Sequence, residues 1–277
     1  MVLWISAILL PLFAMKLDIF QIDAFASQLF SGNPAAVIPL TNWLDEEMMQ
    51  QLAMENNLSE TVFFVPSASD DADYDIRWFT PVLEIDLCGH ATMASAWVLF
   101  NRLGFSKPEI RFSSRSGILT VKRQGEKISL DFPSWHPQPL HSYNSDAVKA
   151  LGNPAIKAVF KYRDLLLELE NEEAVRSLRP DFSLLKTTGE KVIVTAAGRQ
   201  VDFVSRFFAP AAGVDEDPVT GSAHAQLIPY WAARLGKDQL HALQLSPRGG
   251  ELWCEQKGHR VSIAGECAFY MKGEISI

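Results

Sequence analysis

The sequence has few cysteines and no cluster of basic residues, and each of these features excludes a class of protein. Its three cysteines, Cys88, Cys254 and Cys267, form no CxxC pair and cannot all pair with one another. A reduced, cytoplasmic compartment is therefore expected rather than a disulfide framework. The formal net charge is −8 at pH 7, whereas a nucleic-acid interface needs a stripe of Lys and Arg. We therefore expect no nucleic-acid partner.

Long apolar runs are also scarce, and the uncharged run of residues 1–14 stands at the N-terminus. It lacks the basic start and the small-residue cleavage site of a secretory signal, and it is shorter than the roughly 18 to 20 residues that a membrane span needs. We expect no membrane partner and interpret residues 1–14 as a leader upstream of a natural start at Met15. An atypical signal or anchor is the alternative.

The sequence does contain an internal repeat. Residues 77–104 and 206–236 both open with Arg-aromatic-Phe-small-Pro and both close with Arg-Leu-Gly. Gly89 and Gly221 stand at the same distance from the closing glycine, and the second copy has three extra residues, Asp217 among them.

The similarity continues downstream of this repeat. Residues 114–130 and 247–263 share an Arg-x-Gly turn, a strand, a central glycine and a second strand. Because order and spacing are kept across both segments, we predict two homologous halves. The N-terminal half covers residues 15–135 and is joined by the C-terminal strand at 264–277, and the C-terminal half covers residues 136–263.

Each copy of the repeat predicts a buried central helix. From Ala91 and from Ala223 onward the residues are apolar on nearly all sides, which is typical of a buried helix. Gly104 and Gly236 stand where a left-handed C-terminal cap is expected. We therefore predict an α+β fold of two pseudo-symmetric halves, each a curved, mostly antiparallel sheet or barrel wrapped round a central helix.

Both predicted helices begin at a glycine, Gly89 in the first and Gly221 in the second. A helix start offers unpaired N–H groups and a partial positive charge. Glycine lets a ligand approach, so such a place suits a carboxylate or a developing enolate oxygen. Two starts related by a repeat predict two anion-binding ends that face one cleft between the halves.

Two acidic positions are candidate bases. Glu60 heads the apolar strand 61–65, and a carboxylate that loses hydration there would suit a general base. The alternative is an exposed glutamate paired with a lysine. Asp215, Glu216 and Asp217 precede the second helix, where the alternative is that they only complement the helix dipole.

Cys88 and His90 flank Gly89 and could be a nucleophile with its base, part of a metal site, or neither. The repeat counterpart of Cys88 is Thr220, and no Asp or Asn nearby in the sequence would obviously orient His90, so an unreactive thiol is favoured. We expect no metal, because the histidines outside the two helices lack a partner at ligand spacing: His136, His141, His241 and His259.

With these motifs in view, the sequence resembles the PhzF-like family of phenazine biosynthesis, relatives of diaminopimelate epimerase. The motifs that match run in family order between Asp23 and Gly250: DAFASQLFSGNPAAVI, NNLSETVFF, RWFTPVLEIDLCGHAT, GVDEDPVTGSAH and LSPRGG. The resemblance implies two pseudo-symmetric halves with the active site in the cleft between them. It also implies isomerase chemistry without a cofactor, in which a proton is removed from carbon and returned.

The resemblance also implies the catalytic residues. Glu60, in the Ser-Glu-Thr motif, would be the general acid/base, with Asp217 and His90 as further catalytic residues. The epimerase relatives use two cysteines as bases, whereas this family has carboxylates of the Glu60 and Asp217 types. Cys88 would then be a bystander.

The substrate that the resemblance implies is a small carboxylate-bearing metabolite, held at Gly89, Gly221 and Ser222. We expect a homodimer. A non-catalytic binding protein that keeps the cleft, and a hydrolase that depends on Cys88, are the alternatives. Residues 151–181 match the family only in outline and predict a strand followed by a helix.

Overall fold

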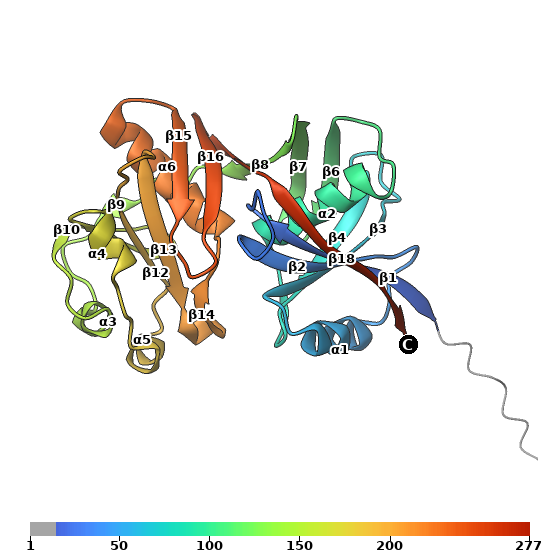
Figure 1. Ribbon diagram of the computed structural model, residues 1–277, viewed down its shortest axis with the longest axis horizontal. Coiled ribbons are helices and arrows are strands. Elements are labelled where there is room, and N and C mark those ends of the chain that lie inside the picture. Colours follow the sequence, from blue (N-terminus) through green and yellow to red (C-terminus); the bar gives the residue numbers. More distant parts are fainter. Residues whose placement is uncertain (1–14) are drawn as a thin grey trace, which may run out of the picture.

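A computed structural model describes residues 15–277 as two lobes side by side, with strands crossing between them (Figure 1). Residues 1–14, interpreted above as a leader, lie outside the described residues. Among the helices that the structure describes, none is long and apolar enough to cross a membrane.

The first lobe contains eight strands that pair in series and two helices. Its elements are β1 (Lys16–Ala24), β2 (Asn33–Pro39), α1 (Glu46–Asn56), β3 (Glu60–Pro66), β4 (Tyr74–Phe79), α2 (Gly89–Asn101), β6 (Glu109–Ser114), β7 (Gly117–Gln124), β8 (Lys127–Pro133) and β18 (Cys267–Ser276). The short strand β5 (Glu84–Ile85) pairs with β4. The last strand of the chain, β18, returns to this lobe and pairs antiparallel with β1.

The second lobe repeats this plan with additional short helices. Its elements are β9 (Gln138–Pro139), α3 (Ser145–Ala150), β10 (Ile156–Lys161), β11 (Leu165–Leu169), α4 (Glu172–Arg176), α5 (Phe182–Thr188), β12 (Val192–Ala197), β13 (Phe203–Ala209), η1 (Pro210–Ala212), β14 (Val214–Asp217), α6 (Gly221–Leu235), β15 (Gln239–Gln244), β16 (Gly250–Lys257) and β17 (Arg260–Gly265).

The two lobes share one order of strand pairing. In the first, β1–β2 is antiparallel, β2–β3 parallel, β3–β4 antiparallel and β4–β6 parallel, followed by the meander β6–β7–β8. In the second, β10, β11, β12, β13, β15, β16 and β17 follow the same scheme. Antiparallel pairing of β8 with β17 joins the lobes into one curved, unclosed sheet. The predicted α+β fold of two pseudo-symmetric halves is therefore confirmed.

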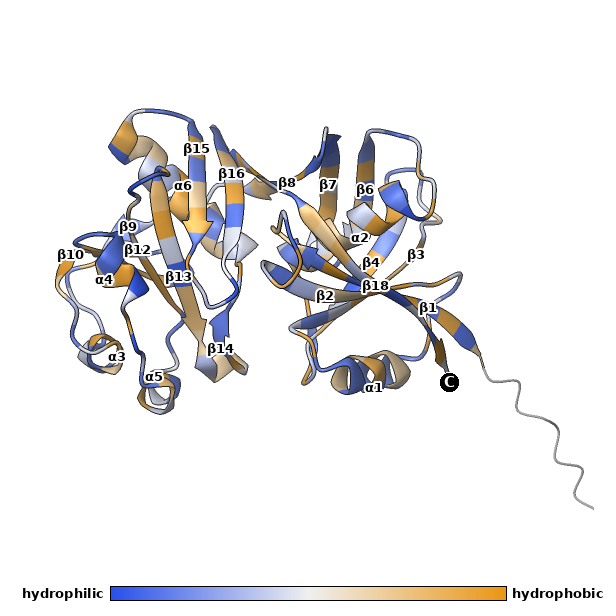
Figure 2. Ribbon diagram, in the orientation of Figure 1, coloured by the Kyte–Doolittle hydropathy of each residue, from blue (hydrophilic) through white to orange (hydrophobic). Residues whose placement is uncertain are grey.

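Each sheet packs its apolar face on a central helix. Along β1, apolar and polar residues alternate except at Ile19–Phe20 (Figure 2), and burial alternates in the first part of the strand. α2 and α6 are buried along most of their length, as the sequence predicts. Gly236 ends α6 in the left-handed region with φ 64°, and Gly104 has φ 71° just beyond α2.

The prediction for residues 151–181 is wrong in part. Instead of one strand and one helix, this segment forms the hairpin β10–β11 and then the short helix α4. The leucine-rich run Leu165–Leu169 is buried throughout, because it lies between β10 and β12 as an inner strand. Continuous apolar runs are typical of strands covered on both faces.

Candidate active site

The starts of the two central helices meet. A methyl group built on Gly89 would lie 3.6 Å from the Cα atom of Gly221 and 3.2 Å from the ring of Phe132. The residues before the helices, Cys88 and Thr220, do not cap them with their side chains. The two helix starts, with their first N–H groups, therefore lie side by side between the lobes, as the repeat predicts.

A cleft with a volume of about 230 Å³ lies at this junction. All six predicted catalytic and substrate-binding residues line it: Glu60, Gly89 and His90 from the first lobe, and Asp217, Gly221 and Ser222 from the second. The apolar part of the wall comes from Ile85, Leu87, Phe132, Phe207, Ala209 and Val214. The cleft thus places ionisable groups and helix starts against apolar surface.

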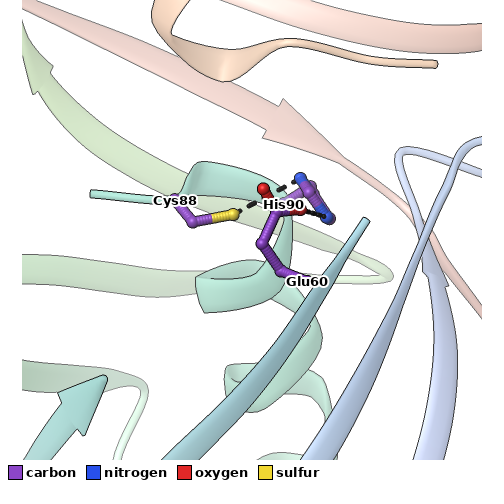
Figure 3. A group of neighbouring side chains, drawn as sticks. All are labelled: Glu60, Cys88 and His90. Atoms are coloured by element: carbon purple, nitrogen blue, oxygen red, sulfur yellow. Dashed lines mark hydrogen bonds and ion pairs between the residues drawn. The ribbon is translucent and has the colours of Figure 1, made fainter. Parts of the chain in front are cut away.

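Glu60 and His90 form the polar centre of the first-lobe side (Figure 3). Oε2 of Glu60 lies 3.0 Å from Nε2 of His90, and the two side chains are only 12% and 5% exposed. The alternative of an exposed glutamate paired with a lysine is therefore wrong. Apart from this contact, neither atom has a hydrogen-bond partner in residues 15–277. The contact between Glu60 and His90 is therefore the one polar interaction of these two atoms in that part of the chain.

Asp217 on β14 is the second buried carboxylate of the cleft. Its Oδ1 accepts a hydrogen bond of 2.7 Å from Nδ2 of Asn33, and its Oδ2 accepts one of 2.5 Å from the hydroxyl of Thr220. Burial raises the pKa of Asp217 to about 6; the charge on His90 opposes this shift and that on Glu60 adds to it. Both oxygens of Asp217 are thus engaged, unlike those of Glu60.

Asn33 connects the two sides of the site, and the sequence argument overlooked it. Its fully buried amide nitrogen lies 3.2 Å from Nδ1 of His90 and 2.7 Å from Asp217. It also donates to the carbonyl of Val219 at 3.0 Å. No Asn stands near His90 along the sequence, but the fold brings Asn33 into contact with it.

The ionisation of His90 and Cys88 is coupled to Glu60. Burial alone would lower the pKa of His90, but its interactions with Cys88 and Glu60, which include a hydrogen bond to each, raise it well above its ordinary value. Burial and the carboxylate of Glu60 raise the pKa of Cys88 to about 11, against the opposing effect of His90. The thiol is therefore protonated at neutral pH, and a thiol is a poor nucleophile in that form.

The donor atoms of Glu60, Cys88 and His90 lie within 4.8 Å of one another and could in principle hold a metal ion (Figure 3). The imidazole, however, stands between the other two groups. Its Nε2 faces Glu60, and its Nδ1 lies 3.5 Å from the sulfur of Cys88. A metal ion binds one nitrogen of an imidazole, so the ring would have to turn before all three donors converged. The arrangement fits a hydrogen-bonded chain better than a metal centre.

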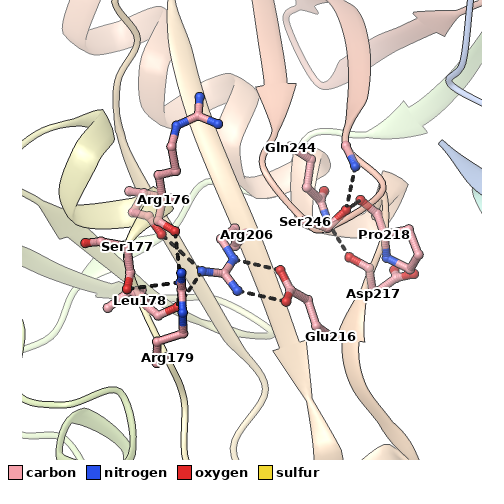
Figure 4. Close-up of polar contacts among 12 residues, drawn as sticks. Arg176, Ser177, Leu178, Arg179, Arg206, Glu216, Asp217, Pro218, Gln244 and Ser246 are labelled. Atoms are coloured by element: carbon pink, nitrogen blue, oxygen red, sulfur yellow. Dashed lines mark hydrogen bonds and ion pairs between the residues drawn. The ribbon is translucent and has the colours of Figure 1, made fainter. Parts of the chain in front are cut away.

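A pair of matching salt bridges stabilises the hairpins on either side of the cleft. Nε of Arg206 donates to Glu216 at 2.7 Å (Figure 4), and Nε of Arg77 donates to Glu84 at the same distance. Each arginine opens its copy of the repeat, and each glutamate lies on the short strand that follows. The three acids before α6 are therefore not equivalent, because Glu216 is paired while Asp217 enters the cleft.

Two further residues, Gln244 and Ser246, fix the backbone around Asp217 through three hydrogen bonds (Figure 4). Nε2 of Gln244 donates to the backbone carbonyl of Asp217 at 2.7 Å, and its Oε1 accepts from the N–H of Thr220 at 2.9 Å. The hydroxyl of Ser246 donates to the carbonyl of Pro218 at 2.9 Å. Gln244 and Ser246 were not predicted, although Ser246 belongs to the LSPRGG motif. They fix the backbone that leads from β14 into α6.

Comparisons with known proteins agree with this architecture. The model of the family described as phenazine biosynthesis-like protein (PhzC-PhzF) matches residues 22–273. Two proteins of Pseudomonas aeruginosa described as uncharacterized isomerases are 50% and 52% identical, over 95% of this chain and 100% of theirs. The crystal structure of a PhzF family protein from Enterococcus faecalis superposes with a TM-score of 0.90 at 48% identity, covering 95% of this chain and 100% of that one. The resemblance drawn from the motifs is thereby confirmed, and the chain belongs to the phenazine biosynthesis-like PhzC-PhzF family.

Proposed function

We propose that the protein is a cofactor-independent isomerase that moves a proton at carbon in a small carboxylate-bearing metabolite, with Glu60 as the general acid/base. The isomerase class is supported by family membership and by relatives whose names describe isomerases. The observation that carries the assignment to Glu60 is the unequal bonding of the two buried carboxylates. Asp217 is held through both oxygens, whereas among residues 15–277 Oε2 of Glu60 contacts only His90.

In this mechanism the two helix starts bind the anionic part of the substrate. N–H groups at Gly89 and Gly221 would donate hydrogen bonds to a carboxylate and then stabilise the negative charge that develops when the carbon loses its proton. Such help is needed because a positioned base contributes only about 10²- to 10⁴-fold to the rate of proton transfer. Ser222, in the first turn of α6, would add a hydroxyl to the same region.

Glu60 would take the proton from carbon and return it to that carbon or to another in conjugation. His90, 3.0 Å away, would orient the Glu60 carboxylate through their contact. Asp217, with a pKa of about 6, would orient the substrate or serve as the partner acid. Asn33 would position both His90 and Asp217 without touching the substrate.

The experiment that tests this function is deuterium exchange. The protein is incubated in D₂O with a panel of small carboxylic acids that carry an acidic C–H, and incorporation of deuterium at carbon is followed by NMR. An isomerase of this type incorporates solvent deuterium into at least one compound of the class. A carboxylate that binds in the cleft but never exchanges would instead indicate a binding protein.

A further inference from the structure

The repeat assigns Lys191 to the place in the second lobe that Glu60 occupies in the first. The residue after Glu60 pairs with Phe79 on β4, and the residue after Lys191 pairs with Phe208 on β13. These two phenylalanines hold the same position in the repeated Arg-aromatic-Phe motif. Glu60 and Lys191 are therefore related by the pseudo-symmetry, and both line the cleft.

The charges on the two walls of the cleft are thus opposite at equivalent positions. Lys191 is exposed, and its chain neighbour Glu190 is already paired with Lys161 at 2.9 Å. Along the second-lobe wall, the apolar residues Phe207 and Ala209 also line the cleft. The ammonium group of Lys191 would attract an anion at a second point of the cleft.

A further cation of the cleft, Arg163, stands at the start of α6. Its Nη2 donates to the hydroxyl of Ser222 at 2.7 Å and to the fully buried carboxylate of Asp164 at 2.9 Å. Its guanidinium carbon lies 5.0 Å from the centre of the Trp135 ring. These contacts fix the guanidinium beside the helix start, where a carboxylate would also meet the free N–H groups of α6.

We propose that the substrate carries two carboxylates, one bound at the helix starts beside Arg163 and the other bound by Lys191. This inference rests on the proposed function, which places the reacting carbon next to Glu60. That carbon would lie between the two bound carboxylates. Two cations are needed because Glu60 and Asp217 repel an anion that enters the same cleft. Nε2 of His90 is a buried polar atom of the same cleft, and its one polar neighbour in residues 15–277 is Oε2 of Glu60. Lys191 is then the residue that selects dicarboxylates over monocarboxylates.

The test compares the binding of succinate, glutarate and butyrate by titration calorimetry. We expect the wild-type protein to bind one of the dicarboxylates about fivefold more tightly than butyrate, the effect of one partly exposed charge contact. In Lys191→Gln the affinity for the dicarboxylate should fall to that for butyrate, and the affinity for butyrate should not change. Arg163→Gln should weaken all three acids together. Lys186→Gln, an exposed lysine on α5 outside the cleft, is the matched control and should behave as wild type.

Thermal unfolding of each variant is measured first, because Arg163→Gln leaves the buried Asp164 without its ion pair. Arg163→Lys, which keeps the charge, is the second variant at that position. Equal affinity of the wild-type protein for dicarboxylates and butyrate would overturn the proposal, as would a preference that survives in Lys191→Gln. Binding needs no turnover, so the result stands apart from the isomerase assignment, which fails only if no carboxylic acid exchanges deuterium.

Discussion

Nε2 of His90 lies 3.0 Å from Oε2 of Glu60, and the helix start of α2 holds the imidazole in place beside the cleft. Because this contact orients the carboxylate that takes the proton, we expect His90→Gln to slow proton transfer by about 10²-fold. The rate of deuterium incorporation into a substrate of the panel measures the effect. A variant that exchanges at the wild-type rate would show that Glu60 works without His90.

Cys88→Ser should leave catalysis within about threefold of wild type, because the thiol is protonated at neutral pH and a proton-transfer mechanism by Glu60 makes no use of it. Deuterium incorporation is again the measurement, and alkylation by iodoacetamide should be slow for the same reason. A loss as large as that of a Glu60 variant would identify the thiol as the reacting group and favour a Cys88-dependent enzyme.

Asp217 makes stability depend on pH. Its pKa rises from 3.8 to about 6 on folding, so the folded state binds more protons than the unfolded state between these values. The stability that the protonated form contributes is therefore present below about pH 4 and lost as the pH rises through about 6. Asp217→Asn should raise the urea midpoint relative to wild type at pH 7.5 and raise it less at pH 5. A difference that is the same at both pH values would contradict the raised pKa. Asp131→Asn, at a partly exposed position outside the cleft, is the control.

The salt bridges of the two hairpins should differ in their effect on stability. Glu216→Gln leaves the guanidinium of Arg206, which is 7% exposed, without its carboxylate, and we expect a loss of about 3 kcal/mol or more in the free energy of unfolding. Glu84→Gln is the repeat-matched comparison. Arg77 is more exposed and keeps its contact with Glu46, so the loss there should be smaller. Urea denaturation of both variants decides the order, and equal losses would contradict the argument from burial.

The fold could be predicted from the sequence where the two copies of the repeat keep the same residues at the same positions. Gly89 and Gly221 start the two helices where these approach each other, and a Cβ on Gly89 would come within 3.2 Å of the Phe132 ring, so this pair of glycines marks the repeat. The strands that precede the repeated segments share the order in which they pair but not their residues. Lys191 replaces Glu60 at one of these positions, so no similarity of residues marks that part of the repeat.

The site could be predicted only where its residues share a local motif. His90 stands in the first turn of α2, and Ser222 stands in the first turn of α6. Asn33 lies 57 residues from His90 and 184 from Asp217 along the chain. No periodicity or spacing relates positions so far apart, because the folded sheet alone brings them together.

The most direct test of the central claim is the rate of deuterium incorporation by Glu60→Gln. Glutamine keeps the shape of the side chain and cannot take up a proton from carbon, so the fold and the binding of a carboxylate should persist while incorporation falls by about 10²- to 10⁴-fold. Melting temperature and affinity for the substrate, measured on the same sample, exclude misfolding as the cause. A Glu60→Gln protein that retains more than about a tenth of the wild-type exchange rate would contradict the assignment of Glu60 as the general acid/base.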